Sequence, residues 1–360
     1  MTNNEIIGKI NEQLDFINFL TDKNLIEYLS KESMITKHSK GQYNNSLPIS
    51  IQEKKEIVAY FYGELFGVLD GLNVFAMMHG LRKKYDVKII EGNGNSGTGI
   101  NKNKTIIGAK IFTDQSIQGF ETMVHEIAHV LTGRNNRHIT LLKKIEKTKT
   151  QQQRMFAEQE YEGYCREKSM CKYDVIGEIE AMSIEKLFLL FLSEDKKCRK
   201  VLEQYQFDID EYINEYEKEH ENMAYERKQK IVEIKQLLDK YKIIDYFKDK
   251  KDFEKFLSKL PSDTARENFR YDMENFFEIN AKYSFRYVTG EAISRYWFDR
   301  YKISNKNQRE QLIDKFVEFW HETDKLDIDQ SSSLLCDGKT FDEVIIEYFE
   351  QTKIRKNKWK

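Results

Sequence analysis

Proline is nearly absent from this chain of 360 residues, which contains only Pro48 and Pro261. Proline is the strongest helix breaker, whereas the abundant lysine, glutamate and leucine are good helix formers. The composition therefore predicts a mostly α-helical protein. No apolar run reaches the length of a membrane-spanning helix, and the first residues, Met-Thr-Asn-Asn-Glu, lack the basic and apolar parts of a signal peptide. We expect a cytoplasmic protein.

Cysteine is scarce, and the net charge is small. The four cysteines show no Cys-x-x-Cys spacing, so reduced thiols are expected rather than a disulfide framework. The 58 basic residues nearly balance the 60 acidic ones, giving a formal charge of -2. This balance argues against a general affinity for nucleic acid, and neither a nucleic acid nor a membrane is an expected partner. The cysteines are Cys165, Cys171, Cys198 and Cys336.

Most of the sequence has helical periodicity, with one β-like part. Residues 51–83 form a strong helical region. Val87 to Ile90 and Thr105 to Phe112 are β-like, and between them lies the single glycine-rich segment, residues 91–99. This segment lacks the Lys-Ser/Thr of a phosphate-binding loop and is expected to be a mobile loop. From about residue 139 onward, helix follows helix.

The most informative segment is Glu121-Thr-Met-Val-His-Glu-Ile-Ala-His-Val-Leu-Thr-Gly133. Side chains four residues apart share a helix face, so His125 and His129 can direct two imidazoles at one cation. Glu126 lies beside them as the expected general base. This arrangement is typical of zinc peptidases. A buried helix has no other evident use for two histidines flanking a carboxylate, and Gly133 is expected to end it.

A third metal ligand has to come from elsewhere in the chain. His138 lies three places beyond the position of the third histidine in His-Glu-x-x-His-x-x-Gly-x-x-His peptidases, which makes it a poor candidate. The apolar helix expected over residues 174–193 carries acids near its start. Glu178 and Glu185 are seven residues apart and share a face, while Glu180 points elsewhere and is the fallback ligand. The alternative is that these acids only border the helix.

Four segments, in this order, resemble the oligoendopeptidase F / thimet oligopeptidase family of zinc metallopeptidases. They are Ser96-Gly-Thr with Lys104 to Phe112, Glu121 to His129, Val175 to Glu185, and Tyr283-Ser-Phe-Arg-Tyr287-Val-Thr-Gly290. The resemblance covers roughly residues 91–350. It implies a helical metallopeptidase with a small β-sheet next to the active-site helix and a deep substrate cleft.

The resemblance also implies functions for single residues. One Zn²⁺ per chain would be held by His125, His129 and Glu178, and Tyr287 would stabilise the tetrahedral intermediate with help from Tyr283. A phenol donates a hydrogen bond without adding charge, which suits a developing oxyanion. The alternative is that these tyrosines belong to the aromatic core of a chain with 20 tyrosines.

Three features depart from the family pattern. The gap between His129 and Glu178 is about twice the usual one, which marks residues 140–170 as an insertion. The histidine that normally precedes the tyrosine segment in the family aligns near Phe277, and this chain has no histidine nearby. The chain is also short for the family. We expect an N-terminal helical region over residues 1–90 and a catalytic region over residues 91–360, in which residues 200–360 complete the cleft.

The sequence therefore predicts an endopeptidase that hydrolyses short or extended peptides. Ile106 to Phe112 is expected to be an edge strand that pairs with the substrate main chain. His79 is expected to be structural, and His220 and His321 are expected at the surface. Two alternatives remain open: a repressor-cleaving metallopeptidase of the ImmA/IrrE kind, whose Glu-x-Glu-Ala pattern Glu178 to Ala181 matches, and a catalytically silent binding protein.

Overall fold

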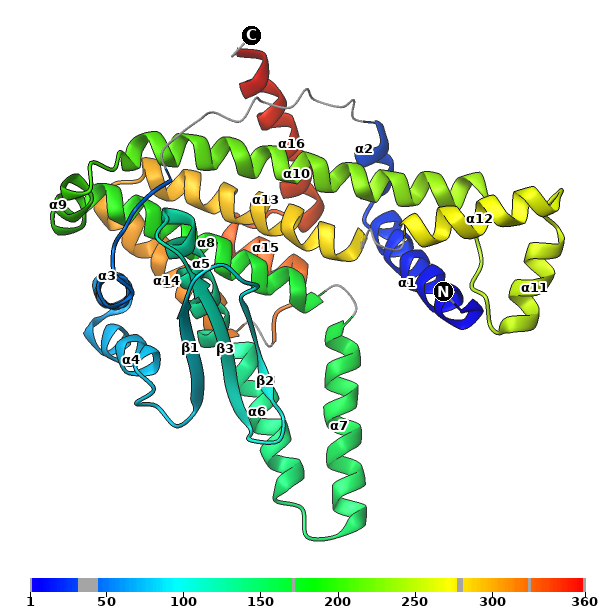
Figure 1. Ribbon diagram of the computed structural model, residues 1–360, viewed down its shortest axis with the longest axis horizontal. Helices are drawn as coiled ribbons and strands as arrows, with labels where there is room; N and C mark the ends of the chain where they lie inside the picture. Colours follow the sequence, from blue (N-terminus) through cyan, green and yellow to red (C-terminus); the bar gives the residue numbers. More distant parts are fainter. Residues whose placement is uncertain (1, 32–44, 170–171, 277–280, 323–324, 359–360) are drawn as a thin grey trace. The chain divides into compact units, whose positions relative to one another are not determined.

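The computed structural model describes residues 2–31, 45–169, 172–276, 281–322 and 325–358 (Figure 1). Within this part, the side chains of residues 31, 133–136, 166–169, 172–174, 275–276, 281–283 and 353–358 are not described. The protein is mostly helical with one small sheet, which confirms the predicted fold class. None of the helices that the structure describes combines the length and the apolar character that a bilayer-spanning segment needs.

The structure describes nineteen elements, from α1 to α16, with three strands between α4 and α5. In order, they are α1 (Asn3–Asp22), α2 (Leu25–Lys31), α3 (Ile51–Phe66), α4 (Val68–Met78), β1 (Tyr85–Glu91), β2 (Gly97–Asn101), β3 (Ile106–Thr113), α5 (Ile117–Leu131), α6 (Gly133–Glu146), α7 (Gln151–Ser169), α8 (Lys172–Glu194), α9 (Lys196–Gln204), α10 (Ile209–Lys240), α11 (Lys250–Ser258), α12 (Asp263–Phe276), α13 (Ala281–Ile303), α14 (Lys306–Glu322), α15 (Ile328–Leu335) and α16 (Phe341–Lys358).

The chain packs into two units. Unit 1 comprises Met1–His38, Glu221–Thr289 and Asp342–Lys360, and unit 2 comprises Ser39–His220 and Gly290–Phe341. Unit 1 is helical, with an aromatic core that includes the buried rings of Phe253 and Phe269. Unit 2 contains the sheet, α5 and α8. The predicted division at residue 90, the insertion over residues 140–170 and the deep cleft stay predictions.

The three strands of unit 2 form a sheet in the order β1-β3-β2. Strand β3 pairs in parallel with β1, Tyr85 lying opposite Ile107, and antiparallel with β2, Gly97 lying opposite Lys110. The prediction that Ile106 to Phe112 is an edge strand is therefore wrong, because β3 is the central strand. The glycine-rich segment is also not entirely a loop, since Gly97–Asn101 forms β2 at an edge of the sheet.

A buried lysine holds the turn between β3 and α5. The Nζ of Lys54, on α3, donates hydrogen bonds to Thr113 Oγ1 at 3.1 Å and to the carbonyl oxygens of Asp114 and Ser116 at 2.5 and 3.2 Å. Burial lowers the pKa of Lys54 to about 8, although Asp114 opposes the shift. Ser116 caps α5 by accepting from the Gly119 amide. The start of the His-Glu-x-x-His helix is thereby fixed against both the sheet and α3.

Helices α5 and α8 pack against each other over an apolar face. The ring centroids of Phe120 on α5 and Phe188 on α8 are 4.8 Å apart, and both residues are fully buried. Burying one such side chain stabilises a fold by about 1.5–3 kcal/mol. A third helix, α13, approaches α8 at Gly290, where an added Cβ would lie 2.9 Å from Glu178 Cβ and 2.8 Å from Met182 Sδ. Only glycine permits this approach.

Other sequence predictions have mixed outcomes. Helix α5 ends at Leu131 with Thr132 as its C-cap residue, so Gly133 directly follows the end of the helix, as expected, and α6 begins there. Cys165, Cys198 and Cys336 are free thiols, as expected, and Cys171 lies outside the described residues. His321 is exposed, as expected, but His220 is half-buried.

Candidate metal centre

Two imidazoles from consecutive turns of α5 face each other. The helix carries an apolar face with Phe120, Val124 and Ile127 buried, which fixes its rotation. His125 and His129 are thereby placed on another side, where both are half-buried. Their Nε2 atoms are 3.0 Å apart. Two nitrogen donors so close together, each with a lone pair in the neutral form, suit a shared cation.

A carboxylate from α8 completes the group. Glu178 Oε2 lies 3.6 Å from His125 Nε2, and Glu178 Oε1 lies 4.0 Å from His129 Nε2. Ligand atoms around a tetrahedral zinc lie roughly 3.3 Å apart. The three donors therefore have the chemistry and nearly the spacing of a zinc site, and they form the one cluster of this kind among the described residues. The residues present fit a zinc ion.

The outer nitrogen of His125 is held by a second acid of α8. His125 Nδ1 lies 2.9 Å from Glu185 Oε1, and the hydroxyl of Tyr216 on α10 donates to Glu185 Oε2 at 3.1 Å. A carboxylate that accepts from Nδ1–H leaves the Nε2 lone pair directed at a metal. Glu178 and Glu185 are seven residues apart on α8, and both contribute to the site. Glu178 joins the donor cluster, and Glu185 orients the ring of His125.

The surroundings of the imidazoles are strongly negative. Burial alone would lower the pKa of His125, but Glu185, Glu178 and Glu126 together raise the pKa to about 9. Burial would also raise the pKa of Glu185, yet the neighbouring His125 lowers it below its ordinary value. This place in the protein therefore favours a positive charge, either a proton on the imidazole or a metal cation.

The carboxylate of Glu126 is fixed by the edge strand. Thr98, on β2, donates its hydroxyl to Glu126 Oε2 at 2.8 Å and lies 3.2 Å from the Glu126 carbonyl oxygen. Glu126 is buried, with 8% of its surface exposed. The structure thereby connects the predicted general base with Thr98 of the Ser-Gly-Thr segment, a contact that the sequence did not suggest.

Glu180, the fallback ligand, has a different partner. Its Oε1 accepts a hydrogen bond from the hydroxyl of Thr132 at 2.8 Å, and its side chain is fully buried. Glu180 thereby supports the turn between α5 and α6 while Glu178 lies with the histidines. His138, which sequence reasoning disfavoured, contacts the rings of Tyr161 and Tyr164 on α7.

Sequence reasoning missed a row of residues on α10 beside the metal cluster. Tyr212 donates to Glu121 Oε2 at 2.8 Å, Tyr216 donates to Glu185, and His220 stacks on Tyr216 with a centroid distance of 4.0 Å. Burial, and then the charge of Glu185, raise the pKa of Glu121 well above its ordinary value. The i, i+4, i+8 spacing of the three rings was visible in the sequence, but their acidic partners were not.

His220 also takes part in a buried ion pair, so its expected position at the surface is wrong. Its Nδ1 lies 3.3 Å from Glu291 Oε2 on α13, and Lys186 Nζ on α8 lies 2.7 Å from the same oxygen. The side chains of Lys186 and Glu291 are each only 2% exposed. Burial would raise the pKa of Glu291, but Lys186 and His220 lower it to about 2.

Replacing Glu291 by glutamine is expected to lower the free energy of unfolding by about 3–5 kcal/mol, because the buried ammonium of Lys186 loses the carboxylate it pairs with. Since the Glu291 pKa is lowered, wild type holds this contribution above about pH 4.5 and loses it as the pH falls towards 2. Denaturant unfolding measures both effects. The matched control, Glu310→Gln in the exposed pair with Lys306, should cost at most about 1 kcal/mol. Equal losses would contradict the prediction.

The tyrosine segment lies on α13. Tyr287 belongs to unit 1, where the Arg227 guanidinium lies 4.1 Å from its ring centroid and Arg286 Nη2 donates to its hydroxyl at 3.1 Å. The side chain of Tyr283 and the whole of Phe277 lie outside the described residues. The predicted action of both tyrosines at the metal centre stays a prediction.

Comparison with known proteins finds a structural similarity but no similar sequence. No family model and no curated protein matches the sequence. Among solved structures, the chain is similar to a provisionally assigned oligoendopeptidase F from Bacillus anthracis str. Ames, with a TM-score of 0.46 and 11% identical residues. The match covers 99% of this chain and 56% of that one, so this chain spans about half the length of the structure it matches. The function has to be inferred from the site residues.

Proposed function

We propose that the protein is a zinc-dependent endopeptidase acting on short or extended peptides. The observation that carries the proposal is the cluster of His125, His129 and Glu178, with Glu126 on the same helix as the two histidines. A donor set of two histidines and one glutamate leaves a fourth position for water, as in catalytic zinc sites. A structural zinc site would instead use four protein ligands.

Each residue of the centre has a proposed role. His125, His129 and Glu178 hold the metal, which when bound polarises the scissile carbonyl and makes water more acidic. Glu126 accepts a proton from the attacking water and passes it to the leaving amine. Thr98 keeps the Glu126 carboxylate in one orientation, and Glu185 does the same for the His125 ring.

The substrate main chain would pair with β2 rather than with β3. Strand β2 ends the sheet, and an edge strand can accept one further strand through main-chain hydrogen bonds. Thr98 lies on this strand and contacts Glu126, so a peptide on the β2 edge lies beside the proposed base. Main-chain pairing recognises any extended peptide, which agrees with a substrate class defined by conformation more than by sequence.

Metal analysis combined with peptide turnover tests the proposal. Purified protein is expected to contain about one zinc per chain and to cleave members of a quenched fluorescent peptide library. A chelator should abolish cleavage, and added zinc should restore it. Zinc at one equivalent in a protein that cleaves no peptide would exclude the peptidase and leave a metal-binding protein. His125→Ala should lose the metal, and full zinc content in that variant would exclude the assigned site.

Replacing Tyr287 by phenylalanine tests the predicted oxyanion donor. The hydroxyl would act only after attack begins, so kcat should fall about 10²–10³-fold while KM and zinc content change little. Tyr283→Phe should cost less if this residue only assists. Steady-state kinetics on one good peptide give the answer, with Tyr60→Phe, a ring packed on Phe191, as the matched control. An unchanged kcat would assign Tyr287 to the aromatic core.

A further inference from the structure

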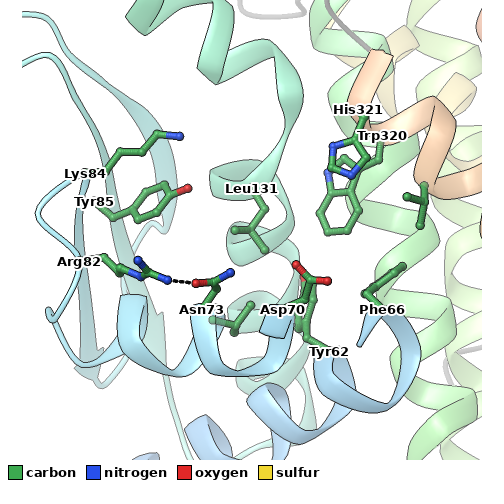
Figure 2. Close-up of a pocket in the computed structure, with 12 residues that line it drawn as sticks. Tyr62, Phe66, Asp70, Asn73, Arg82, Lys84, Tyr85, Leu131, Trp320 and His321 are labelled. Atoms are coloured by element: carbon green, nitrogen blue, oxygen red, sulfur yellow. Dashed lines mark hydrogen bonds between the residues drawn. The ribbon is translucent and has the colours of Figure 1, made fainter. Parts of the chain in front are cut away.

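Unit 2 contains a cavity of about 410 Å³ whose lining includes none of the residues of the metal centre (Figure 2). Its walls come from α3, α4, the start of β1, the last residue of α5, and α14. A volume of this size is in the usual range for small-molecule sites. Leu131 is the residue of α5 that lines it.

The cavity lies on a different side of α5 from the metal centre. An α-helix turns about 100° per residue, so Leu131 projects about 200° away from His129. It also lies six residues beyond His125, roughly 9 Å along the helix axis. A ligand held against Leu131 therefore does not occupy the position between the two histidines.

Three aromatic rings form one wall of this cavity. The ring centroids of Tyr62 and Phe66 are 5.7 Å apart, those of Phe66 and Trp320 are 5.2 Å apart, and those of Tyr62 and Trp320 are 6.2 Å apart. Tyr62 is 1% exposed, and within the described part of the chain its hydroxyl makes no hydrogen bond. A buried phenol without a partner is costly, so this wall offers an unused polar group beside an apolar surface.

The opposite wall is cationic. Figure 2 shows Arg82, Lys84 and Tyr85 along one side of the cavity and Asp70, Phe66 and Trp320 along the other. Arg82 donates to Asn73, which orients its guanidinium. Arg82 and Lys84 face Asp70, so the lining carries a formal charge of about +1. A zwitterion can pair with both the cations and the anion, whereas the phosphate dianion of a nucleotide would be repelled by Asp70.

We propose that this cavity binds a short peptide with free termini and an aromatic side chain. The peptide ammonium pairs with Asp70, its carboxylate with Arg82 and Lys84, and its ring lies on Phe66 and Trp320. The site goes beyond the proposed peptidase function and does not need it, because none of its residues belongs to the metal centre. It is a second peptide-binding site on the same unit.

Calorimetric titration with the dipeptide alanyl-phenylalanine tests the proposal. The Glu126→Gln variant is used as well as wild type, so that hydrolysis cannot obscure binding. We expect one molecule of alanyl-phenylalanine to bind saturably. Its C-terminal amide, its N-acetyl derivative and alanyl-alanine should each bind roughly tenfold or more weakly. Absence of saturable binding below about 10 mM, or tighter binding of adenosine monophosphate, would overturn the proposal.

Matched variants locate the bound dipeptide. Lys84→Met should weaken binding roughly tenfold, whereas Lys83→Met, an exposed neighbour outside the cavity lining, should leave binding unchanged. His125→Ala should bind the dipeptide normally even though it loses the metal. Equal effects of the two lysine variants, or loss of binding in His125→Ala with Lys84→Met unaffected, would place the dipeptide elsewhere and refute the site. Neither result would bear on the peptidase proposal.

Discussion

Replacing Glu126 by glutamine is expected to leave zinc bound and to reduce peptide hydrolysis by about two to four orders of magnitude. The change removes a base and no metal ligand, and a positioned general base contributes roughly 10²–10⁴-fold to a rate. Glutamine retains an oxygen that accepts from Thr98, so the hydrogen bond that fixes the side chain survives. The loss should therefore appear in kcat and leave folding intact.

The measurement is kcat on one peptide together with zinc content. Glu203→Gln, the same chemical change at an exposed position of α9, is the control and should retain full activity. Thr98→Val adds a second check. This variant keeps the Glu126 carboxylate but removes the hydroxyl that donates to it, so kcat should fall less in Thr98→Val than in Glu126→Gln. Near-normal turnover by Glu126→Gln would exclude this residue as the base.

The second large effect is expected at the third metal ligand. Glu178→Ala should lower zinc affinity by more than the roughly 10–100-fold that is typical when a residue supporting a ligand is removed. Glu185→Ala, which releases the His125 ring, should fall within that range. Glu180→Ala should change zinc affinity least, because its carboxylate lies with Thr132.

Zinc affinity is measured for the three variants by competition with a chromogenic chelator. Far-ultraviolet circular dichroism checks that each variant is folded, which matters because all three side chains are buried. The order Glu178, Glu185, Glu180 supports the ligand set proposed here. A larger loss in Glu180→Ala than in Glu178→Ala would instead favour the Glu-x-Glu-Ala reading of the sequence.

The predictable part of the site is the part that depends on local spacing. His125 and His129 share a face because they are four residues apart, whatever the rest of the fold does. Glu178 needed the likeness to a known family, because 49 residues separate it from His129 and spacing alone cannot bridge them. Glu185 was visible on the same face of α8, but its partner His125 became clear only when α5 and α8 were seen to pack.

The errors share one physical cause, which is that strand order and tertiary pairing are long-range properties. The β-like character of Thr105 to Phe112 predicted a strand correctly but could not show that part of the glycine-rich segment would pair with it and cover its edge. Thr98 likewise gained its role only when β2 was placed beside α5. The surface position expected for His220 failed because its partners, Lys186 and Glu291, come from two other helices.

Helix α5 ends two residues beyond His129, and this adds an electrostatic contribution from the backbone. The aligned peptide groups of a helix give its C-terminal turn a partial negative charge of about half an electron. His129 is the basic residue of that turn. A cation shared by the two histidines is therefore stabilised by the helix dipole, typically by about 0.3–1 kcal/mol. Because the helix is interrupted at Thr132, the negative end of its dipole lies next to the cation. If α5 continued into α6 as one helix, that negative end would lie farther from the cation.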